Sequence, residues 1–252
     1  MSPGRAIVCA MTDNSPTDAT SALLNRTAAS AISADTGWRL SMSALRLSVA
    51  VDSLATAHEA AAVAIAACGA KASDHLQVDL RRDRVELTLQ TIARDWITTS
   101  DPELARAIHE ALVEAGFTTF LPTRAHADRP TQALEFAIDA IDIAAIRPFW
   151  KAVLGYVDKP GDDPDYGGLV DPAGQLPQLW FQHMDAPRPQ RNRIHFDLAV
   201  AHDEAEARVA AAIAAGGTVV FDEYARSWWV LADAEGNEIC VCTWLDRDER
   251  GW

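Results

Sequence analysis

Cysteine is scarce in this sequence of 252 residues, which contains only four. A single residue separates Cys240 from Cys242, and none of the four cysteines forms a CxxC pair. The pattern therefore predicts neither a disulfide framework nor a zinc knuckle. Long apolar runs are also missing, because no stretch reaches the roughly 18–20 residues that span a bilayer. The apolar stretch Ala6–Met11 is too short for a secretory signal. We therefore expect a cytoplasmic protein with no membrane partner.

Basic residues are outnumbered, with 22 Lys and Arg against 36 Asp and Glu, which gives a net charge of −14. Nucleic-acid affinity depends largely on the neutralisation of phosphates, so this balance argues against a nucleic-acid partner. The apolar share of 49% and the charged share of 23% are those of an ordinary globular protein. The length suits one large domain or two modest ones.

Two segments lack hydrophobic periodicity and suggest how the chain is organised. Residues 1–18 are predicted to be a disordered tail, and residues 118–131, which contain two prolines, are predicted to be a linker. Domains are then expected at residues 19–117 and 132–247. The charge is uneven, with a net −4 over residues 1–120 and −10 over residues 121–252.

Periodicity predicts a first half with the order α-β-β-α-β-β-α. Alternation of apolar and polar residues is typical of strands, and apolar residues that recur every three to four positions are typical of helices. Asp52 or Ser53 is predicted to cap the second helix, and Gly69 to end it. The expected elements are helices at 19–34, 53–67 and 101–116, and strands at 38–41, 45–51, 75–80 and 84–91.

The second half contains an internal repeat, in which each copy is predicted to be βαβββ. The first copy opens with the alternating strand 134–141 and a helix at 144–154. The pattern returns about sixty residues later with the strand 194–200 and the helix 203–215. The predicted fold class is therefore α+β in both halves.

Three segments of the second half carry motifs in a recognisable order: Asp142…Arg147-Pro-Phe-Trp-Lys-Ala-Val-Leu-Gly155, Asn192-Arg-Ile-His-Phe-Asp197 and Asp233-Ala-Glu-Gly-Asn-Glu-Ile-Cys240. Together they resemble the glyoxalase-like branch of the vicinal-oxygen-chelate (glyoxalase/bleomycin resistance/dioxygenase) superfamily. The resemblance implies that the paired βαβββ modules enclose a cavity. That superfamily includes isomerases, dioxygenases, epimerases, lyases and drug-binding proteins, so the resemblance names no single reaction.

Other motifs lie in the first half: Gly37-Trp38, Asp74-His-Leu-Gln-Val-Asp-Leu80, Arg84-Val-Glu-Leu-Thr-Leu-Gln-Thr91 and Thr98…Asp101-Pro-Glu-Leu-Ala105. They resemble the pterin-4a-carbinolamine dehydratases. That family uses a His-His pair and a later Thr-His, where this sequence has Asp74-His75 and Thr91-Ile92. Because one histidine of three is retained, the resemblance implies a catalytically degenerate domain with a vestigial pterin site at Asp74 and His75. Residual 4a-hydroxytetrahydrobiopterin dehydratase activity, or pterin binding alone, is the alternative.

Alternation also assigns a polar face to the strands of the second half, since successive side chains point to opposite sides of a sheet. Phe136 and Ile138 are expected to face the helix layer, and Glu135 and Asp139 the cavity. The residues predicted to line the substrate pocket are Asp139, Trp180, Gln182, Asp197, Trp229 and Cys240.

The resemblance implies metal ligands on the first and last strands of each repeat. The residues at those positions are Glu135, Gln182, His195 and Glu238, with Cys240 as an alternative to Glu238. This set would suit a divalent ion such as Zn, Mn, Fe or Ni. In the alternative, the pocket holds no metal, and Glu135 and His195 hydrogen-bond each other. Asp197 either orients His195 or pairs with Arg193.

These observations lead to an enzyme hypothesis, with Glu135, His195 and Glu238 as catalytic residues. The enzyme would be a lyase, isomerase or dioxygenase that acts on a small carbonyl or hydroxyl metabolite. The alternative is a protein that binds and sequesters a small molecule without a metal. Both resembled families lead us to expect a homodimer or a higher oligomer.

Overall fold

The computed structural model describes residues 21–32, 36–119, 133–188 and 194–250. The chain divides into two compact units, Met1–Thr131 and Gln132–Trp252. The predicted tail lies outside the described residues, as does the predicted linker apart from residues 118 and 119. Among the helices of the described residues, none has the length and apolar content required to cross a membrane.

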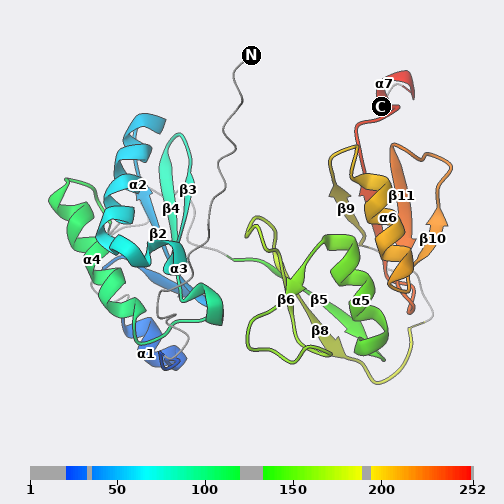
Figure 1. Cartoon of the computed structure of the whole chain (residues 1–252), viewed down its shortest axis with the longest axis horizontal. Helices are drawn as coiled ribbons and strands as arrows, with labels where there is room; N and C mark the ends of the chain where they lie inside the picture. Colours follow the sequence, from blue (N-terminus) through cyan, green and yellow to red (C-terminus); the bar gives the residue numbers. More distant parts are fainter. Residues whose placement is uncertain (1–20, 33–35, 120–132, 189–193, 251–252) are drawn as a thin grey trace, which may run out of the picture. The chain divides into compact units, whose positions relative to one another are not determined.

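The first unit is a four-stranded antiparallel sheet with the strand order β1-β2-β4-β3. Helices α2 and α4 pack together and cover one face of it (Figure 1). Its main elements are α1 (Arg26–Ala31), β1 (Arg39–Ser41), β2 (Ala44–Ala50), α2 (Leu54–Cys68), α3 (Ala72–His75), β3 (Leu76–Leu80), β4 (Arg84–Leu89) and α4 (Asp101–Glu114).

Local sequence explains where the second helix begins and ends. The Ser53 side chain accepts a hydrogen bond from the backbone N–H of Thr56, and Gly69 at φ +58° ends α2, as the sequence predicts. The predicted helix over residues 19–34 is wrong in its extent, since α1 starts only at Arg26, where Asn25 caps it. The predicted strand over residues 75–80 is one residue too long, because His75 ends the short helix α3.

Alternation along the strands places the core of the first unit between the sheet and its helices. Leu45, Leu47 and Val49 of β2 are buried, as are Val85 and Leu87 of β4. The largest buried side chain is that of Trp38, whose Nε1 donates a 3.0 Å hydrogen bond to the carbonyl of Ala105 in α4. This bond ties the start of the sheet to the helix layer.

The second unit consists of two βαβββ modules, the first β5-α5-β6-β7-β8 and the second β9-α6-β10-β11-β12, followed by the short helix α7 (Figure 1). The first module comprises β5 (Glu135–Ala140), α5 (Ile143–Leu154), β6 (Val157–Asp158), β7 (Leu169–Val170) and β8 (Gln178–His183). The second comprises β9 (Phe196–Ala199), α6 (Ala205–Ala214), β10 (Thr218–Phe221), β11 (Trp228–Ala232) and β12 (Glu238–Cys242); α7 is Arg247–Arg250.

Both modules have the same sheet topology, because the first strand pairs in parallel with the fourth. The sheet orders are β5-β8-β7-β6 and β9-β12-β11-β10. Phe136 pairs with Leu179 in the first module, and Phe196 pairs with Ile239 in the second, at an offset of 60 residues on both strands. The repeat predicted from the sequence is therefore a structural repeat, and β5 and β9 each lie at one edge of their sheet.

Candidate functional site

A cavity of about 920 Å³ lies between the two modules of the second unit. Most of β5, from Phe136 to Asp139, contributes to its wall, as do the amino ends of β9 and β12 and helix α5. Its lining residues are Phe136, Ala137, Ile138, Asp139, Ile141, Asp142, Trp150, Met184, Pro187, Arg188, Ile194, Phe196, Glu235, Gly236, Asn237 and Glu238.

Three aromatic rings form one wall of this cavity. The rings of Phe136 and Phe196 have centroids 4.8 Å apart, and Trp150 meets Phe196 edge to face at 6.4 Å. Alternation alone assigned Phe136 to the helix layer, and the structure confirms its packing there while also placing it at the cavity. Recurrence of Phe at the same position of both repeats is the signal that could have identified this wall.

The turn between β11 and β12 fixes the wall from the second module. The buried Asp233 accepts hydrogen bonds from Trp150 Nε1 at 2.9 Å and from the backbone N–H and side chain of Asn237, both also at 2.9 Å. Glu235 accepts from the backbone N–H groups of Ile141 and Asp142, at 2.9 and 2.6 Å. Hydrogen bonds to Asp233 and Glu235 therefore connect the two modules at this turn and shape the cavity.

Two of the predicted site residues, Asp139 and Glu238, line the cavity. Asp139 is exposed at the carboxyl end of β5, and Glu238 is half-buried at the start of β12. Carboxylates at a cavity wall are groups that can take part in proton transfer.

Glu135 does not line the cavity with Asp139 and Glu238. It lies at the other end of β5 from Asp139, about 13 Å away at the usual rise along a strand. Its Oε2 accepts a 3.0 Å hydrogen bond from Gln178. The hydrogen bond between Glu135 and His195, which the metal-free alternative predicts, is absent from the described residues.

Gln182, Trp180 and Trp229 are also absent from the cavity wall. Gln182 is exposed, and its Nε2 lies 3.5 Å from the carbonyl of His183. Trp180, at 38% exposure, neighbours Ala137 across the sheet. Trp229 packs against the hydrophobic core of the unit and does not line this cavity. Strand alternation gives the face of a sheet but not which part of that face is hollowed.

Donor atoms close enough to share one metal ion occur in a single group within the described part of the chain, that of His195, Asp197 and Cys240, where they lie within 4.8 Å of one another. His195 Nε2 is 3.6 Å from Asp197 Oδ1, and Asp197 pairs with Cys240 across β9 and β12. The set is an imidazole, a carboxylate and a thiol, which suits a borderline ion such as Zn²⁺. The predicted quartet of Glu135, Gln182, His195 and Glu238 is not brought together.

Cys240 is the buried member of this triad, at 9% exposure. Burial, with a smaller effect from the hydrogen bond to Asp197, raises the pKa of its thiol to about 12. Without a metal ion the group is therefore a neutral thiol at physiological pH, and metal binding would release its proton. The alternative partner predicted for Asp197, Arg193, lies outside the described residues.

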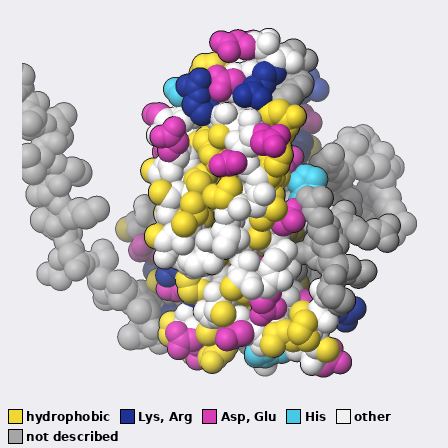
Figure 2. All heavy atoms as spheres, turned by 90° about the vertical axis from the view of Figure 1, so that its right-hand side faces the viewer, with side chains coloured by type: hydrophobic (Ala, Val, Ile, Leu, Met, Phe, Trp, Pro, Cys, Tyr) yellow, Lys and Arg dark blue, Asp and Glu magenta, His cyan; other side chains and the backbone are white. Residues whose placement is uncertain are grey.

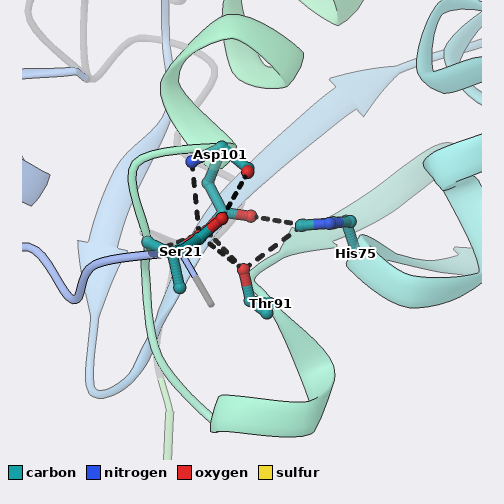
Figure 3. Close-up of polar contacts among 6 residues, drawn as sticks. Ser21, His75, Thr91 and Asp101 are labelled. Atoms are coloured by element: carbon teal, nitrogen blue, oxygen red, sulfur yellow. Dashed lines mark hydrogen bonds and ion pairs between the residues drawn. The ribbon is translucent and has the colours of Figure 1, made fainter. Parts of the chain in front are cut away.

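His75 of the first unit is fully buried, whereas its neighbour Asp74 is exposed. The Nδ1 of His75 donates a 2.8 Å hydrogen bond to the buried carboxylate of Asp101 (Figure 3). Thr91 and Thr98 also donate to Asp101, at 3.0 and 3.2 Å, and the backbone N–H of Thr98 does so at 2.6 Å. The structure thus places His75 in the interior and Asp74 at the surface, and the vestigial pterin site at these two residues stays a prediction.

Residues 135–242 match the family model described as a glyoxalase-like domain. The second unit is therefore similar to a glyoxalase-like domain over these residues, as the sequence motifs predict. No curated protein matches the chain.

Three solved structures are similar to part of this chain. A hypothetical protein from S. aureus is 16% identical, with 47% of this chain and 98% of that chain covered and a TM-score of 0.37. A glyoxalase/bleomycin resistance protein/dioxygenase family enzyme from Burkholderia phytofirmans PsJN is 21% identical. The match covers 45% of this chain and 99% of that chain, with a TM-score of 0.34. A mutant of the fosfomycin resistance protein FosX from Listeria monocytogenes is 11% identical. That structure is a complex with Mn(II) and 1S,2S-dihydroxypropylphosphonic acid. The match covers 49% of this chain and 100% of that chain, with a TM-score of 0.37.

Proposed function

We propose that the second unit binds a small organic molecule in the cavity between its two βαβββ modules. The observation that carries this proposal is a concave volume of about 920 Å³ with an aromatic wall and carboxylates at its edge. Ligand sites are typically concave and largely apolar, with a few polar groups that orient the ligand. The cross-module bonds of Trp150 and Glu235 keep the cavity formed before a ligand arrives.

Filling the cavity tests this proposal. Ala137 lines it and Ala199, at the far end of β9, does not, although both side chains are exposed on strands. Ligand-observed NMR with a fragment mixture is expected to show binding to the wild type and to Ala199→Trp, and its loss in Ala137→Trp. Fragment binding that survives in Ala137→Trp, or no binding to the wild type, would refute the proposal.

A second candidate function is metal-assisted catalysis on a small carbonyl or hydroxyl metabolite, and the donor triad favours it. His195 lies between the cavity residues Ile194 and Phe196, so the triad adjoins the cavity. An ion at this position would act as a Lewis acid on a ligand oxygen. Asp139 and Glu238 would then serve as the acid and base groups on the chain itself.

Elemental analysis by plasma mass spectrometry tests the metal site, using protein purified without chelator or nickel. Metal near one equivalent is expected in the wild type and in the control His183→Ala, which changes an exposed histidine outside the triad. His195→Ala and Cys240→Ala are expected to lose the metal. An empty wild type after soaking with Zn²⁺, Mn²⁺, Fe²⁺ and Ni²⁺ would exclude this function.

For the first unit, we infer a pterin-dehydratase-like architecture that has lost its catalysis. The order of its strands and main helices supports the architecture, and the complete burial of His75 beside Asp101 argues against a proton-transfer role. An assay of carbinolamine dehydration is expected to show no activity above the uncatalysed rate. Activity that disappears in His75→Leu but remains in Asp74→Asn would overturn this inference.

A further inference from the structure

We propose that Arg247 recognises an anionic group, a carboxylate or a similar oxyanion, on the molecule that binds at the donor triad. This inference rests on the metal-assisted function proposed above, and it adds the charge of the ligand and the residue that binds this charge. It is carried by the register of the second sheet, by the contacts of Arg247, and by the lack of an acidic partner for this arginine among the described residues.

Trp228 and the donor triad lie on one face of the second sheet. Asp197 of β9 pairs with Cys240 of β12, and Cys242 pairs with Trp228 of β11. Directly paired residues, and residues two apart along a strand, point to the same side of a sheet. Trp228 is therefore one step of about 7 Å along the strand direction from the triad, on the side away from Glu238.

Arg247 reaches this face from helix α7, which follows β12 in the chain. Its guanidinium carbon lies 5.7 Å from the centroid of the Trp228 ring, and its Nε donates a 2.7 Å hydrogen bond to the carbonyl of Thr243. Burial and the charge of Asp197 raise the pKa of the Cys242 thiol, whereas the charge of Arg247 and its hydrogen bond to the sulfur lower it. Because one thiol interacts with both groups, the guanidinium of Arg247 adjoins the triad at Asp197.

Arg247 is half-buried, and no acidic side chain of the described residues pairs with it. The nearby Arg226, by contrast, donates to both carboxylate oxygens of Asp246, at 3.2 and 2.6 Å. A guanidinium has five N–H donors, and its planar fork fits a carboxylate through two parallel, charge-assisted hydrogen bonds. An oxyanion on a ligand would therefore supply Arg247 with the partner that the described chain does not.

The triad explains why such a ligand would bind at this place. Three protein donors around an ion leave a further position for a ligand oxygen, as in catalytic zinc sites. The charge of Asp197 would then be used by the ion, so it would not offset the charge of Arg247. A molecule with one oxygen for the ion and a second, anionic group for Arg247 uses both parts of this face.

The wider surface agrees with this assignment. Figure 2 shows a group of basic side chains at the end of the displayed face where α7 lies, and acidic side chains along the whole of that face. The chain as a whole carries a net charge of −14. Most of such a surface repels an anionic ligand, which is therefore least opposed near α7.

Six probes separate the charge of the second group from the length of the ligand. Succinate, glutarate and adipate have two carboxylates, and succinamate, glutaramate and adipamate replace one of them with a carboxamide of similar shape. Isothermal titration calorimetry uses the full chain loaded with one equivalent of Zn²⁺. At the best-fitting length, the dicarboxylate is expected to bind about five- to tenfold more tightly than its monoamide. Raising the salt concentration should reduce this ratio.

Variants of Arg247 then locate the preference. Arg247→Gln is expected to lower the affinity for that dicarboxylate about five- to tenfold and to leave both the affinity for the monoamide and the zinc content unchanged. Arg247→Lys keeps the charge but not the planar fork, so it should retain part of the preference. Arg106→Gln removes the same charge from an exposed residue of the first unit and should change neither affinity.

The outcomes separate this inference from the function on which it rests. If the wild type holds zinc but the preference for the dicarboxylate is absent, or survives in Arg247→Gln, the metal site stands and the inference on Arg247 falls. Loss of zinc in Arg247→Gln would also overturn it, since the arginine would then support the metal site itself. If the wild type does not hold zinc, the metal-assisted function falls and this inference falls with it.

Discussion

Trp150 Nε1 donates a 2.9 Å hydrogen bond to Oδ2 of Asp233, and this bond crosses from α5 of the first module to the β11–β12 turn of the second. Both side chains are nearly inaccessible, at 1% and 3% exposure. The bond fixes the Trp150 ring against Phe196 and so determines the shape of the cavity. A tryptophan inside a helix and an aspartate in a turn 83 residues later thus build one wall.

Replacing Trp150 with Phe keeps most of the ring but removes the N–H donor. One buried oxygen of Asp233 then loses a partner, and we expect the free energy of unfolding to fall by about 1–3 kcal/mol. Urea denaturation followed by circular dichroism measures the change. Trp244→Phe, which alters a ring that is 62% exposed, should leave stability within about 0.5 kcal/mol of the wild type. Equal effects of the two variants would contradict the structural role of the bond.

The buried pair of His75 and Asp101 predicts a second stability effect. His75→Leu leaves the Asp101 carboxylate buried with one donor fewer, so a loss of about 2–4 kcal/mol is expected. Asp74→Asn, one residue away but exposed, is the matched control and should cost less than about 0.5 kcal/mol. Chemical denaturation of the full chain tests both variants, and a stable His75→Leu protein would show that the pair is dispensable.

Cys68 predicts a dependence of stability on pH. Burial, with a smaller contribution from Asp101, raises the pKa of its thiol to about 11, whereas an unfolded thiol has a pKa of about 8.5. Above that lower value the native state retains a proton that the unfolded state releases. The stabilisation that the neutral Cys68 thiol gives the native state is therefore complete below about pH 8 and is lost as the pH rises toward 11. The free energy of unfolding falls over this range by at most about 1.4 kcal/mol per pH unit.

Cys68→Ala should remove this dependence. The difference in unfolding free energy between the wild type and the variant is expected to be constant from pH 6 to 8 and to shrink between pH 9 and 10.5. Urea titrations across this range provide the measurement. If the unfolding free energies of the wild type and of Cys68→Ala change in parallel up to pH 10.5, the thiol titrates in the native state as it does in the unfolded state.

Two glycines with similar backbone angles predict different costs of substitution. Gly37 and Gly116 have φ of +80° and +86°, so an alanine is strained at either position by about 1 kcal/mol. A methyl group at Gly37 would also overlap the backbone oxygen of Thr119, whereas nothing lies near Gly116. Thermal denaturation should show a clearly larger loss for Gly37→Ala, and equal losses would indicate that the segment at Thr119 moves away freely.

The sequence alone determined what depends on neighbours along the chain. Alternation gave the buried faces of β2, β4 and β5, and Ser53 with Gly69 gave the start and end of α2. The repeat gave the two βαβββ modules, because each copy contains the same order of apolar segments. These features follow from local geometry, which has a period of two in strands and 3.6 in helices.

Only the tertiary structure decided which side chains meet. It paired Glu135 with Gln178, His195 with Asp197, and His75 with Asp101, and it placed the cavity along β5 and the β11–β12 turn. A sequence pattern gives the face of each strand, but contacts across the edges of two sheets depend on how the modules dock. That docking is set by packing between residues far apart in the chain, such as Phe136 with Phe196 and Trp150 with Asp233, whose pairing no local period encodes.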